Sequence, residues 1–231
     1  MKLNLRYKGH KAQHSHKWVI TILLGLLSGI CQPVWAQPRE FVEGVHYQAL
    51  AKPVQTETDA DRIEVREIFW YGCPECATLE PVMTDWGEGV RGDLVLHRMP
   101  AIWNNIMALH ARIYYSAIAV NAEDAIHAAA FKAIHQDNNP LRTEFQIREL
   151  FLANSVTAEA FDKAWNSGEV NLQVENARQR TAEYNVEKLP SVIVNGRFEV
   201  THNKAISNHI ELNIAVNMLV RRLRDERRTD F

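Results

Sequence analysis

The chain has 231 residues, 46% of them hydrophobic and 23% charged, with a formal net charge of −2. This length suffices for one well-packed domain with room for an insertion. The charge falls to −7 once the basic first 36 residues are set aside, because 21 Lys and Arg then stand against 28 Asp and Glu. Such an acidic balance argues against nucleic acid as a partner.

Residues 1–36 have the pattern of a secretory signal peptide. Residues 19–30 form an apolar stretch that is too short for a comfortable membrane span. Val34, Trp35 and Ala36 have the spacing of a cleavage site, so Gln37 is the expected new N-terminus. An uncleaved anchor is the alternative interpretation. The segment before the apolar stretch contains no acid and five basic residues, Lys2, Arg6, Lys8, Lys11 and Lys17.

The cysteine count supports export to the periplasm. Of the three cysteines, Cys31 lies in the expected signal peptide, so only Cys73 and Cys76 remain in the mature chain. Disulfides persist in exported compartments. A pair this close in sequence closes almost no loop, so it constrains the unfolded chain very little. A purely structural disulfide therefore explains the pair poorly.

The first half of the mature chain predicts three strands and one helix. Residues 45–50 alternate weakly and form a short first strand, and residues 63–71 are rich in strand formers, as a buried strand should be. A helix follows over residues 74–86. Residues 94–99 form the third strand, which Pro100 ends.

Residues 104–184 change to a helical period, with apolar side chains three and four positions apart. Strand character returns at residues 191–194, and Asn195 with Gly196 predicts a type I′ hairpin turn. The return strand covers residues 197–201, and a last helix covers residues 206–224.

This order of elements predicts an α/β thioredoxin fold with an inserted all-helical domain. The expected divisions are the signal peptide at 1–36, a first thioredoxin-like part at 37–103, the helical insertion at 104–184 and a second thioredoxin-like part at 185–231.

Cys73 and Cys76 lie at the turn between the second strand and the helix that follows it. The amino end of a helix presents unpaired N–H groups and a positive dipole, which favour a thiolate, and the thiolate is the nucleophile. Pro74 suits the first helical position, where its missing N–H costs nothing. We therefore expect an exposed, reactive Cys73, with Cys76 lying deeper. A zinc site is the alternative, but it needs two more ligands, and no histidines are paired near the cysteines.

Four stretches of the mature chain resemble the DsbA family of exported thiol–disulfide oxidoreductases. They are residues 69–76 (FWYGCPEC), 147–151 (IRELF), 161–167 (FDKAWNS) and 189–196 (LPSVIVNG). The second and third lie in the helical insertion, which ordinary thioredoxins lack. The resemblance implies that Cys73 and Cys76 are the redox pair, that no other cofactor or metal is used, and that Pro190 follows a cis peptide bond, although trans is the general default.

The resemblance also places an acidic residue beneath the redox pair at Glu67 and a second acid in the active-site helix at Glu80. The sequence departs from the family at Glu75, where such families often have His, and at Leu189, where Val, Thr or Ile is usual. The lysine that accompanies the buried acid in some members has no clear match in this chain.

Two of these carboxylates have testable expected roles. Glu67 lies in an apolar strand, so its pKa should rise and it can exchange a proton with Cys76. Glu75 should disfavour the Cys73 thiolate and weaken the disulfide as an oxidant. A solvated Glu67 or a Glu75 that points to solvent is the alternative for each. Trp70 and Tyr71 are either core or an apolar rim for clients, and His97, His110, His127 and His135 are interpreted as structural or solvated.

The resemblance implies that the Cys73–Cys76 disulfide is donated to newly exported proteins and recharged by a DsbB-type, quinone-linked membrane oxidase, with the enzyme acting as a monomer. A reductase or isomerase is a second interpretation, although no added dimerisation module is visible. A chaperone or binding module that uses its groove and not its thiols is a third, from another functional class.

Overall fold

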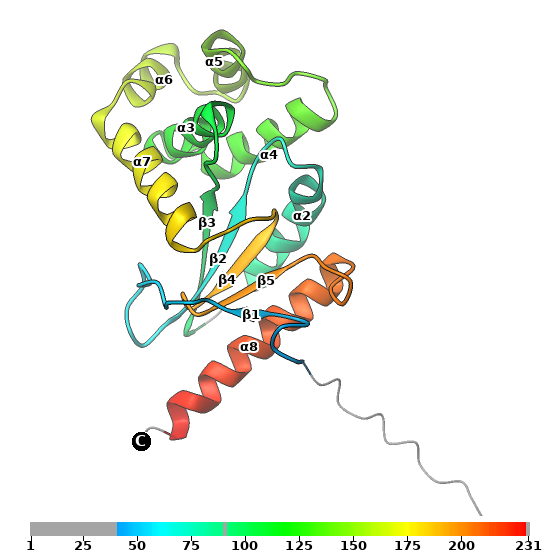
Figure 1. Cartoon of the computed structure of the whole chain (residues 1–231). Coiled ribbons are helices and arrows are strands. Elements are labelled where there is room, and N and C mark those ends of the chain that lie inside the picture. The colour runs from blue at the N-terminus through cyan, green and yellow to red at the C-terminus, as the bar shows by residue number, and fades with distance from the viewer. Residues whose placement is uncertain (1–40, 90–91, 230–231) are drawn as a thin grey trace, which may run out of the picture. The chain divides into compact units, whose positions relative to one another are not determined.

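A computed structural model of the protein describes residues 41–89 and 92–229. The expected signal peptide lies outside these residues. Within the described part of the chain, five strands form one sheet and seven helices surround it (Figure 1). None of the helices in this part is long and apolar enough to cross a membrane.

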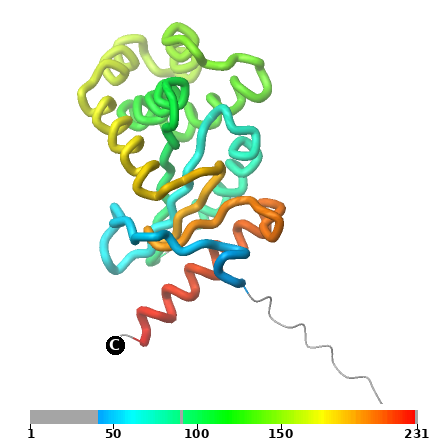
Figure 2. Tube along the Cα trace, in the orientation of Figure 1, coloured from blue at the N-terminus to red at the C-terminus, as the bar shows by residue number. Residues whose placement is uncertain are grey.

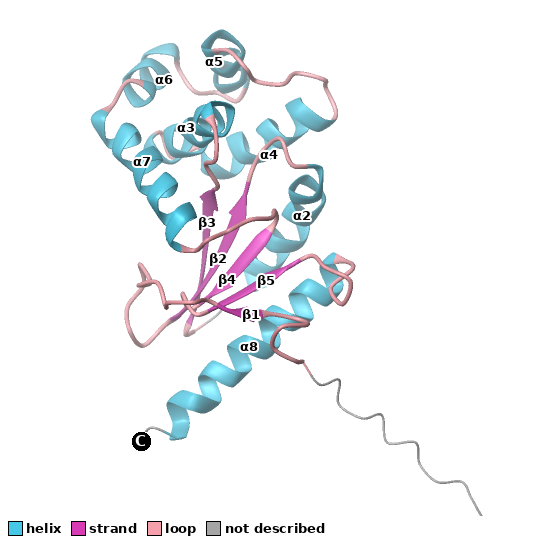
Figure 3. Cartoon of the chain, viewed as in Figure 1, coloured by secondary structure: helices cyan, strands magenta, loops and turns pink. Residues whose placement is uncertain are grey.

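The sheet has the strand order β1-β5-β4-β2-β3. The central strand β2 runs parallel to β3 and antiparallel to β4, and β4 continues antiparallel to β5 and then β1. This mixed sheet confirms the predicted thioredoxin plan (Figure 3). The bounds are β1 Gln48–Ala49, β2 Ile63–Phe69, β3 Leu94–Pro100, β4 Ser191–Val194 and β5 Phe198–Thr201.

Helices cover both faces of the sheet. On one face, Val65 of β2 packs with apolar side chains of α2 (Pro74–Gly89) and α8 (His209–Thr229). Because side chains alternate along a strand, Ile68 points to the other face. There it joins a cluster with side chains of α3 (Asn105–Ala119) and α7 (Gly168–Glu183). β2 is consequently buried along its whole length.

The helical insertion gathers at the end of the sheet where β2 stops, as the Cα trace also shows (Figure 2). It consists of α3 and α7 together with α4 (Glu123–His135), α5 (Glu144–Ala153) and α6 (Ala158–Trp165), all between β3 and β4 in the chain. Its core is continuous with the end of β2, because Phe69, Cys73 and Cys76 belong to the same buried cluster as the side chains of α3 to α6.

The second thioredoxin half matches the sequence prediction closely. Asn195 and Gly196 have φ values of 52° and 61°, as a type I′ turn requires. The last helix differs, since it covers His209–Thr229 and not residues 206–224. The side chain of Asn208 caps it by accepting a hydrogen bond from the Glu211 N–H at 3.0 Å, so the helix begins later than its apolar period suggested.

Candidate active site

A tight turn joins β2 to α2 and carries the first cysteine. The Cys73 N–H donates to the Trp70 carbonyl at 3.0 Å, which closes a four-residue turn. The predicted extension of β2 to Tyr71 was therefore wrong by two residues, because the chain leaves the sheet after Phe69 to form this turn. Tyr71 is fully buried, so it belongs to the core and not to a client-binding rim.

Cys73 immediately precedes α2, and Pro74 is the first residue of that helix, as predicted. Both cysteines are free thiols. The expectation of an exposed Cys73 was wrong: the residue is only 7% exposed, whereas Cys76 is completely buried. The Leu189 carbonyl oxygen, 3.8 Å from the Cys73 Sγ, and the Glu75 carboxylate, at 3.6 Å, flank the sulfur.

The two thiols are electrostatically unequal. A hydrogen bond from the Cys76 thiol, and another from the Cys76 N–H at 3.4 Å, lower the pKa of Cys73 despite its burial. Burial, followed by the interaction with Cys73, raises the pKa of Cys76 far above the usual thiol range. Cys73 is therefore the sulfur that ionises first and the better leaving group of the pair.

Glu75 opposes this ionisation. Its side chain is exposed, but its carboxylate can accept a hydrogen bond only from the protonated Cys73 thiol. Its negative charge raises the pKa of Cys73, although less than the Cys76 interactions lower it. The direction of the Glu75 effect is as predicted, and the Glu75 carboxylate contacts the Cys73 sulfur although its side chain is exposed.

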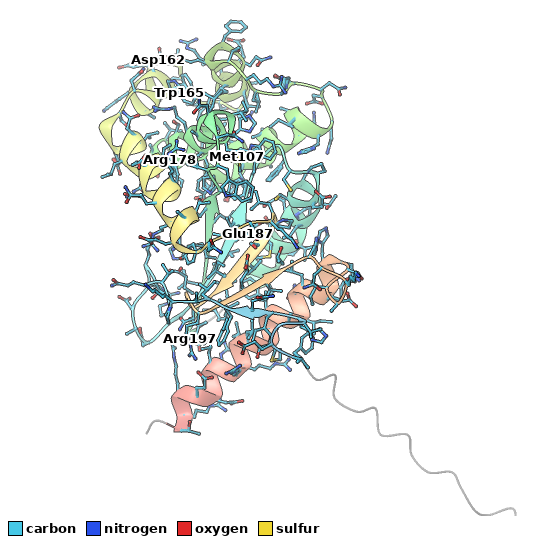
Figure 4. The ribbon with its side chains drawn as sticks, in the orientation of Figure 1. Met107, Asp162, Trp165, Arg178, Glu187 and Arg197 are labelled. Atoms are coloured by element: carbon cyan, nitrogen blue, oxygen red, sulfur yellow. The ribbon has the colours of Figure 1, made fainter. Side chains whose placement is uncertain are left out.

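The peptide bond between Leu189 and Pro190 is cis, as the resemblance implied. Pro190 is buried and leads directly into β4. The segment that precedes it runs from the end of α7 past Glu187 to the start of β4 (Figure 4). The chain thereby brings Leu189, 116 residues away in sequence, beside the Cys73 sulfur.

Glu67 is 1% exposed and lies on β2 beneath the cysteines. Its carboxylate lies 3.3 Å from the Arg98 Nε of β3, but neither oxygen has a hydrogen-bond partner among the described residues. Burial, followed by the charge of Glu80, raises the pKa of Glu67 to about 8, although Arg98 opposes the shift. The raised pKa confirms the prediction, and Glu67 is not a solvated edge residue.

Glu80 connects Arg98 to the helical insertion. One of its oxygens lies 3.3 Å from Arg98 Nη2, and the other accepts a hydrogen bond at 2.9 Å from His127 Nε2 of α4. Burial alone would raise the pKa of Glu80, but His127 and then Arg98 outweigh it and lower that pKa. Glu80, Arg98 and His127 also line a cleft of about 720 Å³.

The sequence interpretation did not single out Arg98, and it described His110, His127 and His135 only as structural or solvated. Arg98 is the cation beside the buried Glu67 carboxylate, and the available signal was a positive charge inside the apolar strand β3. His110, His127 and His135 all contact the Trp70–Tyr71 segment of the turn. No sequence signal identified these contacts, because each joins positions 40 to 64 residues apart.

A search of residues 41–89 and 92–229 finds no group of three or more His, Cys, Asp or Glu side chains placed to hold a metal ion. The free thiols of Cys73 and Cys76 are reactive groups whose chemistry is thiol–disulfide exchange.

Comparison with known proteins gives a consistent result. The family model of the DsbA-like thioredoxin domain matches residues 72–209. The thiol:disulfide interchange protein DsbA of Pseudomonas aeruginosa is 31% identical over 163 residues, which cover 71% of this chain and 77% of that protein. The protein of the same name from Burkholderia cepacia is 26% identical over 90% of this chain and 96% of its own length.

Solved structures show the same likeness. The crystal structure of Pseudomonas aeruginosa DsbA superposes with a TM-score of 0.77 and 28% identity, covering 81% of this chain and 97% of that one. The oxidoreductase DsbA from Xylella fastidiosa gives a TM-score of 0.74 and 26% identity, covering 80% and 98%. The chain therefore belongs to the DsbA family of thioredoxin-fold thiol–disulfide oxidoreductases.

Proposed function

We propose that the Cys73–Cys76 disulfide is donated to newly exported proteins through a mixed disulfide at Cys73. The inequality of the two thiols carries this proposal, because a stabilised Cys73 thiolate favours the reduced form of the pair and makes its disulfide an oxidant.

In the first step, a client thiolate attacks the Cys73 sulfur and displaces Cys76 as a thiolate. A second client thiolate then attacks the client sulfur of the mixed disulfide and releases the Cys73 thiolate. The client loses two thiol protons and two electrons and gains one disulfide, and the enzyme pair takes up both electrons. The Cys76 thiolate must take up a proton as it is released, because its site strongly disfavours the anion.

Glu67 is the proposed proton donor and acceptor for Cys76. Burial and Cys73 account for most of the rise in the pKa of Cys76, and the charge of Glu67 adds to it, which supports this role. A carboxyl group with a pKa of about 8 is largely protonated at neutral pH, so it can give a proton to the departing sulfur and later take it back. Burial is the main cause of this raised pKa of Glu67, the charge of Glu80 adds to it, and Arg98 opposes it.

Clients are proposed to bind as an extended strand beside Leu189. Within the described part of the chain, the Leu189 N–H has no hydrogen-bond acceptor, while its carbonyl faces the Cys73 sulfur. Pairing of a client backbone with this residue would place a client cysteine next to Cys73 without demanding a particular client sequence.

Export and recharging complete the proposal. Residues 1–36 direct the chain to the periplasm, where a DsbB-type, quinone-linked membrane oxidase accepts its electrons. The enzyme acts as a monomer and uses no cofactor besides the Cys73–Cys76 pair.

Equilibration with glutathione redox buffers tests the direction of transfer. We expect a reduction potential above the value of about −270 mV typical of thioredoxin and below the value of about −120 mV of the strongest oxidants of this kind, because Glu75 opposes the Cys73 thiolate. The oxidised protein should also form a disulfide in a reduced two-cysteine peptide in a single turnover. A potential at or below that of thioredoxin, with no peptide oxidation, would assign a reductase.

A further inference from the structure

The peptide between Tyr71 and Gly72 lies at the centre of the turn from Trp70 to Cys73. The hydrogen bond that closes this turn is compatible with more than one orientation of that peptide. The Tyr71–Gly72 peptide lies between the two hydrogen-bonded ends of the turn. Gly72 does not have a positive φ, which excludes a type II turn. Glycine adopts either sign of φ at little cost, so a flip of this peptide between the two turn types is sterically open to the backbone.

Position 72 cannot easily carry a larger residue that would remove this freedom. A Cβ placed on Gly72 would overlap the indole ring of Trp70. The indole is held in place by His110 of α3, whose Nδ1 accepts a hydrogen bond from Trp70 Nε1 at 3.0 Å and whose Nε2 donates to the Pro140 carbonyl at 3.3 Å. The turn thus contains a glycine by steric necessity.

His135 supplies a constraint on the peptide itself. Its Nε2 lies 2.7 Å from the Tyr71 carbonyl oxygen, and a carbonyl can only accept, so this nitrogen carries the hydrogen. The ring is half-buried at the end of α4 and stacks on Phe131 with a centroid separation of 6.2 Å. A flipped Tyr71–Gly72 peptide would point its oxygen away from His135 and lose this hydrogen bond.

The same peptide determines where the nucleophile lies. Cys73 ends the turn and begins the approach to α2, and its sulfur accepts a hydrogen bond from the Cys76 N–H at 3.4 Å. This bond is already long, so a small rotation of the Cys73 backbone weakens it.

We propose that His135 is a positioning residue for disulfide exchange, holding the Tyr71–Gly72 peptide in the orientation that keeps the Cys73 sulfur at the amino end of α2. The proposal rests on the nucleophilic role of Cys73 proposed above. It makes the helical insertion a direct determinant of thiol reactivity, through one side chain and one backbone carbonyl.

Three variants test this role. His135→Leu keeps the stacking volume but removes the donor, whereas His135→Gln places an amide donor where Nε2 lies. Arg112→Leu is the matched control, because Arg112 Nη1 also donates to a backbone carbonyl at 2.7 Å, that of Trp165, far from the turn in sequence. Each reduced protein is titrated by thiolate absorbance, each oxidised protein is mixed with a reduced two-cysteine peptide, and each is unfolded in urea.

We expect His135→Leu to raise the Cys73 titration midpoint and slow peptide oxidation at pH 7 about tenfold, the effect of losing one hydrogen bond. His135→Gln should stay within about twofold of the parent rate. Arg112→Leu should lose stability with an unchanged thiolate titration. Unchanged exchange in His135→Leu, or a His135→Gln variant as slow as His135→Leu, would overturn the proposal.

A measurement on the unaltered protein covers the case in which His135→Leu does not fold. Nitrogen NMR of the histidine rings should show the hydrogen of His135 on Nε2 in the reduced and oxidised forms, and the Nδ1–H tautomer would refute the contact. Failure of the Cys73 role itself is distinguishable, since the unaltered protein would then form no mixed disulfide at Cys73.

Discussion

At the amino end of α2, the Glu75 carboxylate Oε2 lies 3.6 Å from the Cys73 Sγ. The charges of the two groups repel each other when both groups are ionised. Replacing Glu75 with Gln removes the charge at nearly constant shape, and replacing it with His adds a positive charge below the histidine pKa. We expect the Cys73 pKa to fall in Glu75→Gln and to fall further in Glu75→His.

Thiolate absorbance against pH measures this effect in the reduced proteins. The difference between Glu75→Gln and the parent should shrink at about 1 M salt, because the carboxylate is exposed and therefore screened. An unchanged Cys73 pKa in both variants would refute the electrostatic role of Glu75. The reduction potential should rise as the Cys73 pKa falls.

Glu67 makes stability depend on pH. Its pKa is about 8 in the folded protein and 4.5 when unperturbed, so the folded state binds more protons than the unfolded state between these values. Its contribution to stability is therefore fully present below about pH 4.5 and is lost as the pH rises through about 8. Between pH 5 and 8, the free energy of unfolding of the parent protein should fall by a few kcal/mol because of Glu67. In Glu67→Gln this fall should be absent.

Urea unfolding of the oxidised protein at several pH values checks this prediction without interference from the Cys76 thiol. Glu159→Gln, which removes an exposed carboxylate from the first turn of α6, serves as the control. An identical pH slope for Glu67→Gln and the parent would contradict the raised pKa.

At the scale of elements, β2 shows which features of a strand a sequence pattern can predict and which it cannot. Its apolar residues correctly predicted a buried central strand, but Glu64 and Arg66 are buried on it as well, at 1% and 3% exposure. Arg66 pairs with Glu64 at 2.9 Å and with Glu57 at 2.8 Å. Glu57 comes from a segment that appears only as a polar loop in the sequence, so the pairing depends on how that loop folds back.

Replacing Arg66 should strongly lower the free energy of unfolding. In Arg66→Met the buried Glu64 carboxylate loses the cation with which it pairs among residues 41–89 and 92–229, and breaking a buried pair in this way costs about 3–5 kcal/mol. Arg178→Met is the control, because the Arg178–Glu175 pair on α7 is exposed and worth about 0–1 kcal/mol. Urea unfolding measures the loss of unfolding free energy in each variant. Equal losses would show that the buried pairing of Arg66 with Glu64 and Glu57 stabilises the protein no more than an exposed ion pair does.

The active site also combines features that depend on neighbouring residues in sequence with features that depend on contacts between distant residues. Pro74 at the first position of α2 and the hairpin turn at Asn195 are set by neighbours in sequence, and both predictions were correct. The Glu80–His127 hydrogen bond joins α2 to α4 across 47 positions, so it follows only from packing of the insertion. Burial of Cys73 also follows from packing, since Leu189 arrives from a distant part of the chain.

At the scale of the whole molecule, the helical insertion and the sheet share one core around the cysteines. We propose the boundaries 104–184 for this insertion within the thioredoxin-like parts. If activity resides in the thiols, a Cys73→Ser, Cys76→Ser protein should fold normally but lose all oxidative refolding of a reduced client. Full retention of refolding assistance by this double variant would instead favour a thiol-independent chaperone.

The readiness of one sulfur to ionise is the basis of every function proposed above. The most direct measurement is the rate of alkylation of the reduced protein as a function of pH, with the modified cysteine identified by mass spectrometry. The structure predicts modification of Cys73 alone, with a midpoint below the ordinary thiol pKa of about 8.5. A midpoint at or above that value, or earlier labelling of Cys76, would contradict the account.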